Sequence, residues 1–308
     1  MDNVCHTLVG AALGEAGLKR GSRFSATALM ISANIPDLDV LIFATNTPPV
    51  SFRRGWTHGI VAQIALPILL TGVLWLLDRR RPREQDRTPP FHAGWLLLLS
   101  YVGVYSHVFL DYLNNYGVRL LTPFDWRWFY GDAVFIVDPW LWLVLGVGVW
   151  LARRRRAPAS STYALVIASL YIATMLISAR AARGIVDRQW TDAHGAPPHA
   201  LMVGPVPLSP LTRDVVVDAG THYERGSFSW PATLDLNEHI PKNDDRPEVA
   251  AAREDPRIRA ILVWSRFPFW TLEPVEGGTR VTVIDARFMA RGTFSASTVV
   301  PARPGSSD

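Results

Sequence analysis

The sequence predicts a mainly α-helical, membrane-embedded bundle of about five to six membrane segments, some of them broken, followed by a small soluble C-terminal domain of the α+β or β-rich class. Of its 308 residues, 49% are hydrophobic, and the long apolar stretches lie in the first 180 residues. Lys and Arg gather at the ends of those stretches, which is typical of membrane topology. From Arg180 onward no stretch is long and apolar enough to span a bilayer.

The basic character of the chain does not indicate nucleic-acid binding. An isoelectric point near 9.4 suggests nucleic acid in a soluble protein, but here the positive residues flank apolar segments and indicate orientation in a membrane. Cys5 is the single cysteine, which excludes an intrachain disulfide. We expect a membrane and a lipid as partners and no nucleic acid, and the sequence indicates no protein partner.

The first two segments are short or interrupted. Asp2–Leu18 is predicted to be a short helix that carries Asp2 and His6 on one face. The basic turn Lys19–Arg23 follows it. The next segment, Phe24–Ala44, is long enough to cross a bilayer.

This second segment is predicted to be broken. Pro36 must kink or end the helix, and Asp37 and Asp39 follow it directly. Carboxylates beside a broken helix at membrane depth usually line a site. Capping of a helix after the proline is the alternative role for them.

The third segment, Gly59–Leu77, is a continuous apolar span that ends in the basic run Arg79–Arg83. His58 precedes it, either as a metal ligand or as an interfacial residue. Arg53 and Arg54 lie just before His58. They are candidate substrate-binding residues for a phosphate group, or alternatively anchors at the membrane interface.

The fourth segment, Trp95–Leu113, carries the most informative pair. His107 and Asp111 are four residues apart, so both lie on one face of a helix. A carboxylate at the centre of a bilayer costs about 2.5–3.5 kcal/mol, so the pair needs a partner. A divalent metal ion suits both side chains, and a hydrogen bond between the two is the alternative.

Two more segments complete the bundle. Pro139–Ala152 ends in the basic run Arg153–Arg156, and Thr162–Ala179 crosses once more. Asp138 stands before Pro139, where an acidic residue caps a helix whose first residue is proline. A role for Asp138 as a metal ligand stays open at this point.

The basic turns predict orientation. The positive-inside rule puts Lys19–Arg23, Arg79–Arg83 and Arg153–Arg156 in the cytoplasm. Alternation of the segments then brings six ionisable side chains to the outer face of the membrane: His6, Asp37, Asp39, His58, His107 and Asp111. We therefore expect a multi-pass protein of the bacterial inner membrane, with the site and the C-terminal domain on the periplasmic side.

Four motifs also carry a resemblance. MDNVCHTLVG, NIPDLD, RRGWTH and SHVFLDYLNNYGVRLLTPF resemble the successive motifs of the inner-membrane metal-dependent hydrolase family exemplified by YdjM, which is grouped with the zinc-dependent phospholipase C and P1 nuclease fold. The resemblance covers about Met1–Pro139. It implies that the same six residues, His6, Asp37, Asp39, His58, His107 and Asp111, are metal ligands.

Three histidines and three aspartates suit hydrolytic chemistry. Mixed nitrogen and oxygen ligands fit Zn²⁺ best, or Mn²⁺ if the acids dominate, and the set can hold one ion, two or more. Two ions sharing a carboxylate can activate a water and stabilise a phosphoryl centre. We expect Asp111 and Asp39 to be catalytic as well as ligating.

Two functions follow from this chemistry. The first is a membrane-bound metal-dependent hydrolase that cleaves a phosphoester in a lipid or lipid-linked substrate. Its site would open at the membrane–water interface, where lipid head groups can reach it. The second is a metal-ion or proton-coupled transporter, because intramembrane Asp and His also mark ion pathways. Ligands near one surface favour the hydrolase, whereas ligands accessible from both surfaces favour the transporter.

The remaining chain is predicted to be a separate domain. We expect residues 1–180 to form the metal-binding helical domain, 181–300 the outer domain, and 301–308 a disordered tail. Strand patterns are interrupted by a helix near Pro247–Asp255, and Glu276–Thr279 is expected to join the last two strands as a hairpin. The histidines of this part, His194, His199, His222 and His239, lack close ligand spacing and are expected at the surface.

Overall fold

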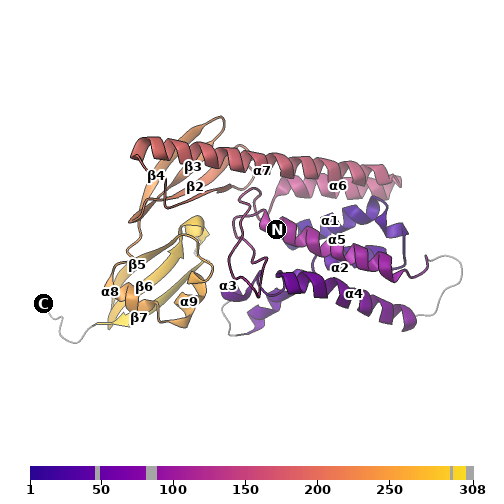
Figure 1. Cartoon of the computed structure of the whole chain (residues 1–308), viewed down its shortest axis with the longest axis horizontal. Helices are drawn as coiled ribbons and strands as arrows, with labels where there is room; N and C mark the ends of the chain where they lie inside the picture. The colour runs from indigo at the N-terminus through magenta and orange to yellow at the C-terminus, as the bar shows by residue number, and fades with distance from the viewer. Residues whose placement is uncertain (46–48, 81–88, 292–293, 303–308) are drawn as a thin grey trace. The chain divides into compact units, whose positions relative to one another are not determined.

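The computed structural model describes residues 1–45, 49–80, 89–291 and 294–302. The chain forms two compact units, one of Met1–Leu41, Arg53–Ala179 and Gly204–Pro210, the other of Ile42–Phe52, Arg180–Val203 and Leu211–Asp308. The first unit is helical and the second is rich in strands (Figure 1).

The helical unit is built from consecutive helices that pack side by side (Figure 1). In chain order they are α1 (Asn3–Glu15), η1 (Leu18–Arg20), α2 (Ser25–Ser32), most of η2 (Ile35–Ala44), α4 (Ile60–Arg80), α5 (Ala93–Tyr112), α6 (Pro139–Arg155) and the first part of α7 (Pro158–His194). Helix α5 packs against α2 and α4, and α1 packs against α2 and α6.

Fewer helices reach the length of a membrane span than the sequence suggested. Among the described residues three do so, α4, α5 and α7, and a fourth is added if α2 and η2, bent by 49°, count as one broken span. The expected five to six segments included α1, whose 13 residues are short of a span, and α6, whose 17 residues lie at the lower limit of span length. The break between α2 and η2 falls just before Pro36, where the proline predicted it.

The outer surface of these helices suits hydrocarbon. Helix α4 exposes Ile64, Leu69 and Leu76, each about half exposed or more. Such a continuous apolar surface is unfavourable in water and is expected where lipid surrounds a helix.

The basic turns of the helical unit meet at one end. Arg153, in the last turn of α6, pairs with Glu15 at the end of α1 at 2.9 Å. Arg23 pairs with Asp78 near the end of α4 at 3.2 Å. The part of the predicted basic run that follows Arg80 lies outside the described residues. The described parts of the basic turns share one end of the unit, because one ion pair joins the turn after α1 to α4 and the other joins the end of α1 to α6.

The second unit confirms a β-rich C-terminal region. Four strands form one antiparallel sheet in the order β1-β2-β3-β4 and three form another in the order β5-β6-β7. The strands are β1 (Ala200–Pro205), β2 (Thr212–Asp218), β3 (His222–Ser229), β4 (Thr233–Pro241), β5 (Pro268–Val275), β6 (Gly278–Asp285) and β7 (Ser295–Pro301). The short helices are α3 (Pro49–Phe52), α8 (Pro247–Ala252), α9 (Pro256–Leu262) and η3 (Ala286–Arg291).

The predicted hairpin is confirmed between β5 and β6, but these are not the last two strands, because β7 follows them and pairs with β6. Val275 pairs with Gly278 across the turn, and Gly277 has a φ of +85°, which glycine adopts without steric cost. The disordered tail was predicted to begin at residue 301, but Pro301 is the last residue of β7. Residues 303–308 lie outside the described part of the chain.

Candidate metal centre

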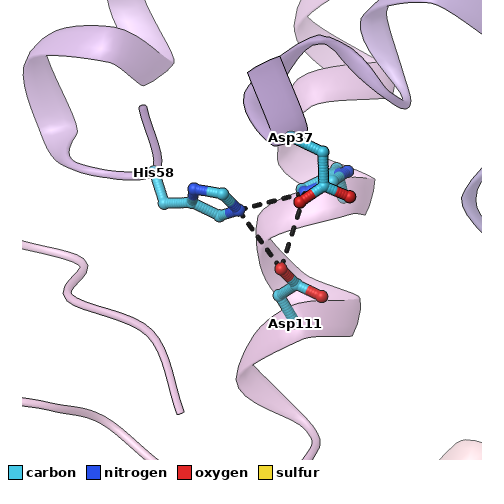
Figure 2. Close-up of side chains that lie close together, drawn as sticks. Asp37, His58 and Asp111 are labelled. Atoms are coloured by element: carbon cyan, nitrogen blue, oxygen red, sulfur yellow. Dashed lines mark hydrogen bonds and ion pairs between the residues drawn. The ribbon is translucent and has the colours of Figure 1, made fainter. Parts of the chain in front are cut away.

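A cluster of buried histidines and aspartates lies in the helical unit, at the end away from the basic turns. His107 and Asp111 come from the C-terminal half of α5, Asp37 from η2, and His58 from the loop before α4. Figure 2 shows Asp37, His58 and Asp111 converging from these three segments. Each of the four residues offers a ligand atom, and those atoms lie within 4.8 Å of one another.

A glycine permits the close packing that forms the site. Helix α5 approaches the end of α2 so closely at Gly103 that an added Cβ atom would lie 1.9 Å from the Ser32 hydroxyl oxygen. His107 is one turn further along α5 and reaches the backbone of Ala33. Any larger residue at position 103 would separate the two helices and withdraw His107 from the segment that carries Asp37.

The tautomer of His107 is fixed by the backbone. Its Nδ1 lies 2.8 Å from the carbonyl oxygen of Ala33. A carbonyl oxygen can only accept, so Nδ1 carries the proton and donates it. The lone pair is therefore on Nε2, which lies 3.1 Å from His58 Nε2 and 3.5 Å from Asp111 Oδ2. Such an outer partner commonly orients a metal-ligating histidine.

Asp111 lies at the centre of the contacts. One carboxylate oxygen is 3.2 Å from His58 Nε2, and the other is 3.3 Å from His6 Nε2 and in contact with the Met1 amino group. The side chains of Asp111, His6, His58 and His107 are fully buried.

His6 lies against the cluster but outside the set of four. Its ring stacks on His107 with 3.8 Å between centroids. Within the described residues, its Nδ1 has no hydrogen-bond partner, and its Nε2 has the 3.3 Å contact with Asp111 Oδ1 without the geometry of a hydrogen bond. A buried imidazole without hydrogen bonds is costly, so its position beside Asp111 suits a further ligand.

Arginines hold the carboxylates in place. Arg53 lies 3.3 Å from both Asp37 Oδ1 and Asp39 Oδ1. Arg54 contacts both oxygens of Asp111 at 3.0 Å through Nη2 and Nε, a two-point geometry typical of strong Arg–carboxylate pairs. In this structure the two predicted substrate-binding residues are thus paired with site carboxylates.

Asp39 does not join the set of four ligand atoms. It accepts hydrogen bonds from the backbone N–H of Arg54 at 2.7 Å and from the hydroxyl of Thr57 at 3.3 Å. Its Oδ2 lies 3.7 Å from His58 Nδ1. In this position it orders the loop that carries Arg54 and His58.

Asp138 takes the capping role and lies outside the cluster. It accepts from the backbone N–H of Leu141 at 3.0 Å and from the hydroxyl of Tyr171 at 2.9 Å.

Asn114 is a site residue that sequence analysis missed. Its Oδ1 accepts from Arg54 Nη1 at 3.0 Å and from the backbone N–H of Tyr116 at 2.9 Å. Asn114 is fully buried. Asn114 lies just beyond Tyr112, the last residue of α5, so helical periodicity could not connect it to Asp111.

The donor set fits a divalent metal ion. Two imidazoles and two carboxylates supply the mixed nitrogen and oxygen atoms that Zn²⁺ and Mn²⁺ accept. The lack of hydrogen bonds at the buried ring of His6 and the outer partner of His107 are two further features that suit such a site. The buried cluster could therefore bind a metal ion, with Asp37, His58, His107 and Asp111 as its first candidates.

Comparisons with known proteins place the chain in a family. The family described as YdjM inner membrane protein matches residues 1–181. A Bacillus subtilis (strain 168) protein, the uncharacterised YfhP, is 23% identical over 312 aligned residues, covering 97% of this chain and 90% of the relative. No solved structure matches the chain significantly. Because the family match covers more than half of the chain and every residue of the cluster, this chain belongs to the YdjM inner membrane protein family.

Proposed function

We propose that this protein is a membrane-bound, metal-dependent hydrolase that cleaves a phosphoester in a lipid or lipid-linked substrate at the outer face of the inner membrane. The observation that carries the proposal is the buried set of Asp37, His58, His107 and Asp111, whose ligand atoms lie within 4.8 Å of one another. Zn²⁺ is the preferred ion, with Mn²⁺ as the alternative. His6 is proposed as an additional ligand, and Asp39 as the carboxylate that positions His58.

When bound, a divalent ion supplies Lewis acidity that polarises a phosphoryl oxygen and makes a water more acidic. The reaction joins the oxygen of that water to phosphorus and breaks the bond from phosphorus to the leaving alcohol. One proton passes from the water to the departing oxygen. The carboxylate of Asp37 would relay that proton to the leaving oxygen, because both oxygens of Asp111 are held by Arg54.

The charge of the site supports an anionic substrate. The carboxylates of Asp37, Asp39 and Asp111 are balanced by Arg53, Arg54 and the Met1 amino group. A divalent ion adds two positive charges to that balance. An incoming phosphodiester, with one negative charge, or phosphomonoester, with up to two, offsets that positive excess, and the guanidinium groups of Arg53 and Arg54 can then turn to its oxygens.

An apolar cavity among the helices of the same unit favours a lipid substrate. It has a volume of about 240 Å³ and is lined by α1, α5, α6 and α7, with Cys5, Leu110 and Leu165 among its residues. Cys5 and Leu110 are the chain neighbours of His6 and Asp111. We propose that this cavity takes part of an acyl chain while the phosphoester lies at the metal centre.

The position of the cluster favours the hydrolase over the transporter. The basic turns meet at one end of the helical unit, and the ligands come from the other end of α5. A carrier needs its ligands accessible from both surfaces, whereas an interfacial hydrolase needs them near one. Placing the basic turns in the cytoplasm puts the proposed site on the periplasmic side.

The test is hydrolysis by the purified full-length protein in vesicles of bacterial phospholipids. The protein is stripped with a chelator, resupplied with Zn²⁺ or Mn²⁺, and the released head group and lipid product are identified by mass spectrometry. We expect head-group release that depends on added metal and is lost in Asp111→Asn. Metal uptake into the vesicle lumen without any lipid product would instead support the transporter.

A further inference from the structure

A second group of metal-type side chains lies on the C-terminal unit. Strands β3 and β4 are antiparallel, and their register pairs Glu224 with His239. His222 is two residues before Glu224, so its side chain points to the same side of the sheet. Tyr223, between them, is buried in the core of the unit. His222, Glu224 and His239 therefore stand together on the opposite, solvent-facing side.

The three side chains converge on one carboxylate oxygen. Glu224 Oε1 lies 3.2 Å from His222 Nε2 and 2.9 Å from His239 Nδ1. The two imidazole centroids are 4.1 Å apart. The three ligand atoms lie within 4.8 Å of one another, so one ion can be reached by all three with small rotations of the side chains.

The neighbourhood supports ligation rather than a chance surface contact. The hydroxyl of Thr221 lies 3.2 Å from His222 Nδ1, the ring nitrogen that faces away from Glu224. A partner on the outer nitrogen orients an imidazole for metal binding. The side chains of His222 and Glu224 are 27% and 24% exposed, so the group is held in place but open to solvent.

We propose that His222, Glu224 and His239 form a second site for a divalent transition-metal ion, distinct from the buried cluster. Two imidazole nitrogens and one carboxylate oxygen suit Zn²⁺, Cu²⁺ or Ni²⁺, whereas Ca²⁺ and Mg²⁺ prefer oxygen ligands only. Three protein ligands leave a coordination position open. The ion is therefore exchangeable and accepts a small ligand from solution.

An adjoining cavity gives room for that ligand. It has a volume of about 310 Å³ and is lined by residues that include His194, His199 and Asp218 as well as His222 and Glu224. Further imidazole and carboxylate groups around the cavity suit the capture of an ion from dilute solution.

Zinc titration of the full-length, metal-stripped protein against a chromogenic chelator tests this site. We expect a double variant, His222→Ala with His239→Ala, to bind one ion fewer per chain than wild type. The single variant His239→Gln should lower the affinity for that ion by more than roughly 10- to 100-fold, which is the loss expected when only an outer partner of a ligand is removed. His239 is well exposed, so this single change tests the site even if the double variant folds poorly.

Two comparisons make the result specific. Glu238→Gln is the matched control, since Glu238 neighbours His239 on β4 but pairs with Arg225 at 2.9 Å, and it should bind zinc as wild type does. The histidine changes should remove the same ion in an Asp111→Asn background, which separates this site from the buried cluster. Wild-type stoichiometry and affinity in a folded His239→Gln or double variant would overturn the proposal.

Discussion

The Nδ1–H of His107 donates to the carbonyl oxygen of Ala33 at 2.8 Å, which ties α5 to the end of α2 and turns Nε2 toward the cluster. A substitution can separate these two roles. In His107→Asn the side-chain amide can still donate to Ala33, but no atom replaces Nε2. We expect stability within about 1 kcal/mol of wild type and a loss of bound metal, measured by elemental analysis alongside a melting curve.

His107→Gln is the counterpart of that variant. The glutamine amide reaches toward the position of Nε2 but no longer makes a hydrogen bond to the carbonyl oxygen of Ala33. The His107→Gln protein should therefore be less stable than the His107→Asn protein. Full metal content in a folded His107→Asn protein would mean that His107 serves structure alone.

Arg54 is predicted to make the stability of the protein depend on metal. Its side chain is 6% exposed and contacts both oxygens of Asp111. In Arg54→Met the carboxylate loses this partner, and breaking a buried ion pair costs about 3–5 kcal/mol. A bound ion can supply the missing charge. The melting temperature should therefore fall markedly in chelator and recover on addition of Zn²⁺.

Arg127→Met provides the matched control for that change. Arg127 pairs with Asp125 at 2.6 Å but is largely exposed, so its loss should have little effect in either condition. Equal destabilisation of Arg54→Met with and without zinc would contradict the assignment of Asp111 to a metal site.

Asp214 gives the C-terminal unit a predictable pH dependence. Burial raises the pKa of the Asp214 carboxyl to about 6, against the opposing influence of Arg225 at 3.4 Å. The folded state therefore binds this proton more tightly than the unfolded state, whose pKa is near 3.8. The contribution of this carboxyl group to the free energy of unfolding is therefore fully present below pH ~4 and is lost as the pH rises through ~6.

The variant Asp214→Asn should remove this loss. Amide hydrogens of β2 and β3 should exchange more slowly than in wild type at pH 7.5. The expected gain in the free energy of unfolding is at most about 2–3 kcal/mol, set by the shift in the pKa of Asp214. At pH 4 the two proteins should differ little. If Asp214→Asn slowed exchange relative to wild type by the same factor at pH 4 and at pH 7.5, the charge on Asp214 would not be the cause.

Topology is open to a direct test. Reporter fusions after Arg156, at the end of α6, and after Gly195, just beyond α7, should report opposite sides, with Gly195 outside. The reason is the basic end of α6 and the span-length α7 that follows it. Cytoplasmic activity of the Gly195 fusion would reverse the orientation of both the C-terminal unit and the proposed site.

Local periodicity explains what the sequence could predict. The spacing of His107 and Asp111, the break at Pro36 and the cap at Asp138 each depend on neighbours within about one helical turn. Local signals do not settle the number of spans, because α6, with 17 residues, lies at the lower limit of span length. Among the described residues, length and composition select α4, α5, α7 and the bent pair of α2 and η2.

Long-range pairing explains what the sequence could not predict. Arg54 meets Asp111 across 57 positions, and Asp39 turns to Arg54 and Thr57 rather than to the four ligand atoms. The group of His222, Glu224 and His239 depends on strand register, which residue spacing does not fix.

Metal content of Asp111→Asn tests the central claim most directly. The amide keeps the shape of the side chain and a neutral acceptor for a neighbouring imidazole, but it removes the charge. If the pair were only structural, the change would cost about 1 kcal/mol or less, the scale of intramembrane hydrogen bonds. We predict that zinc or manganese in the buried site and lipid hydrolysis are lost together in a folded Asp111→Asn protein, whereas full metal content and full activity in that protein would contradict the account.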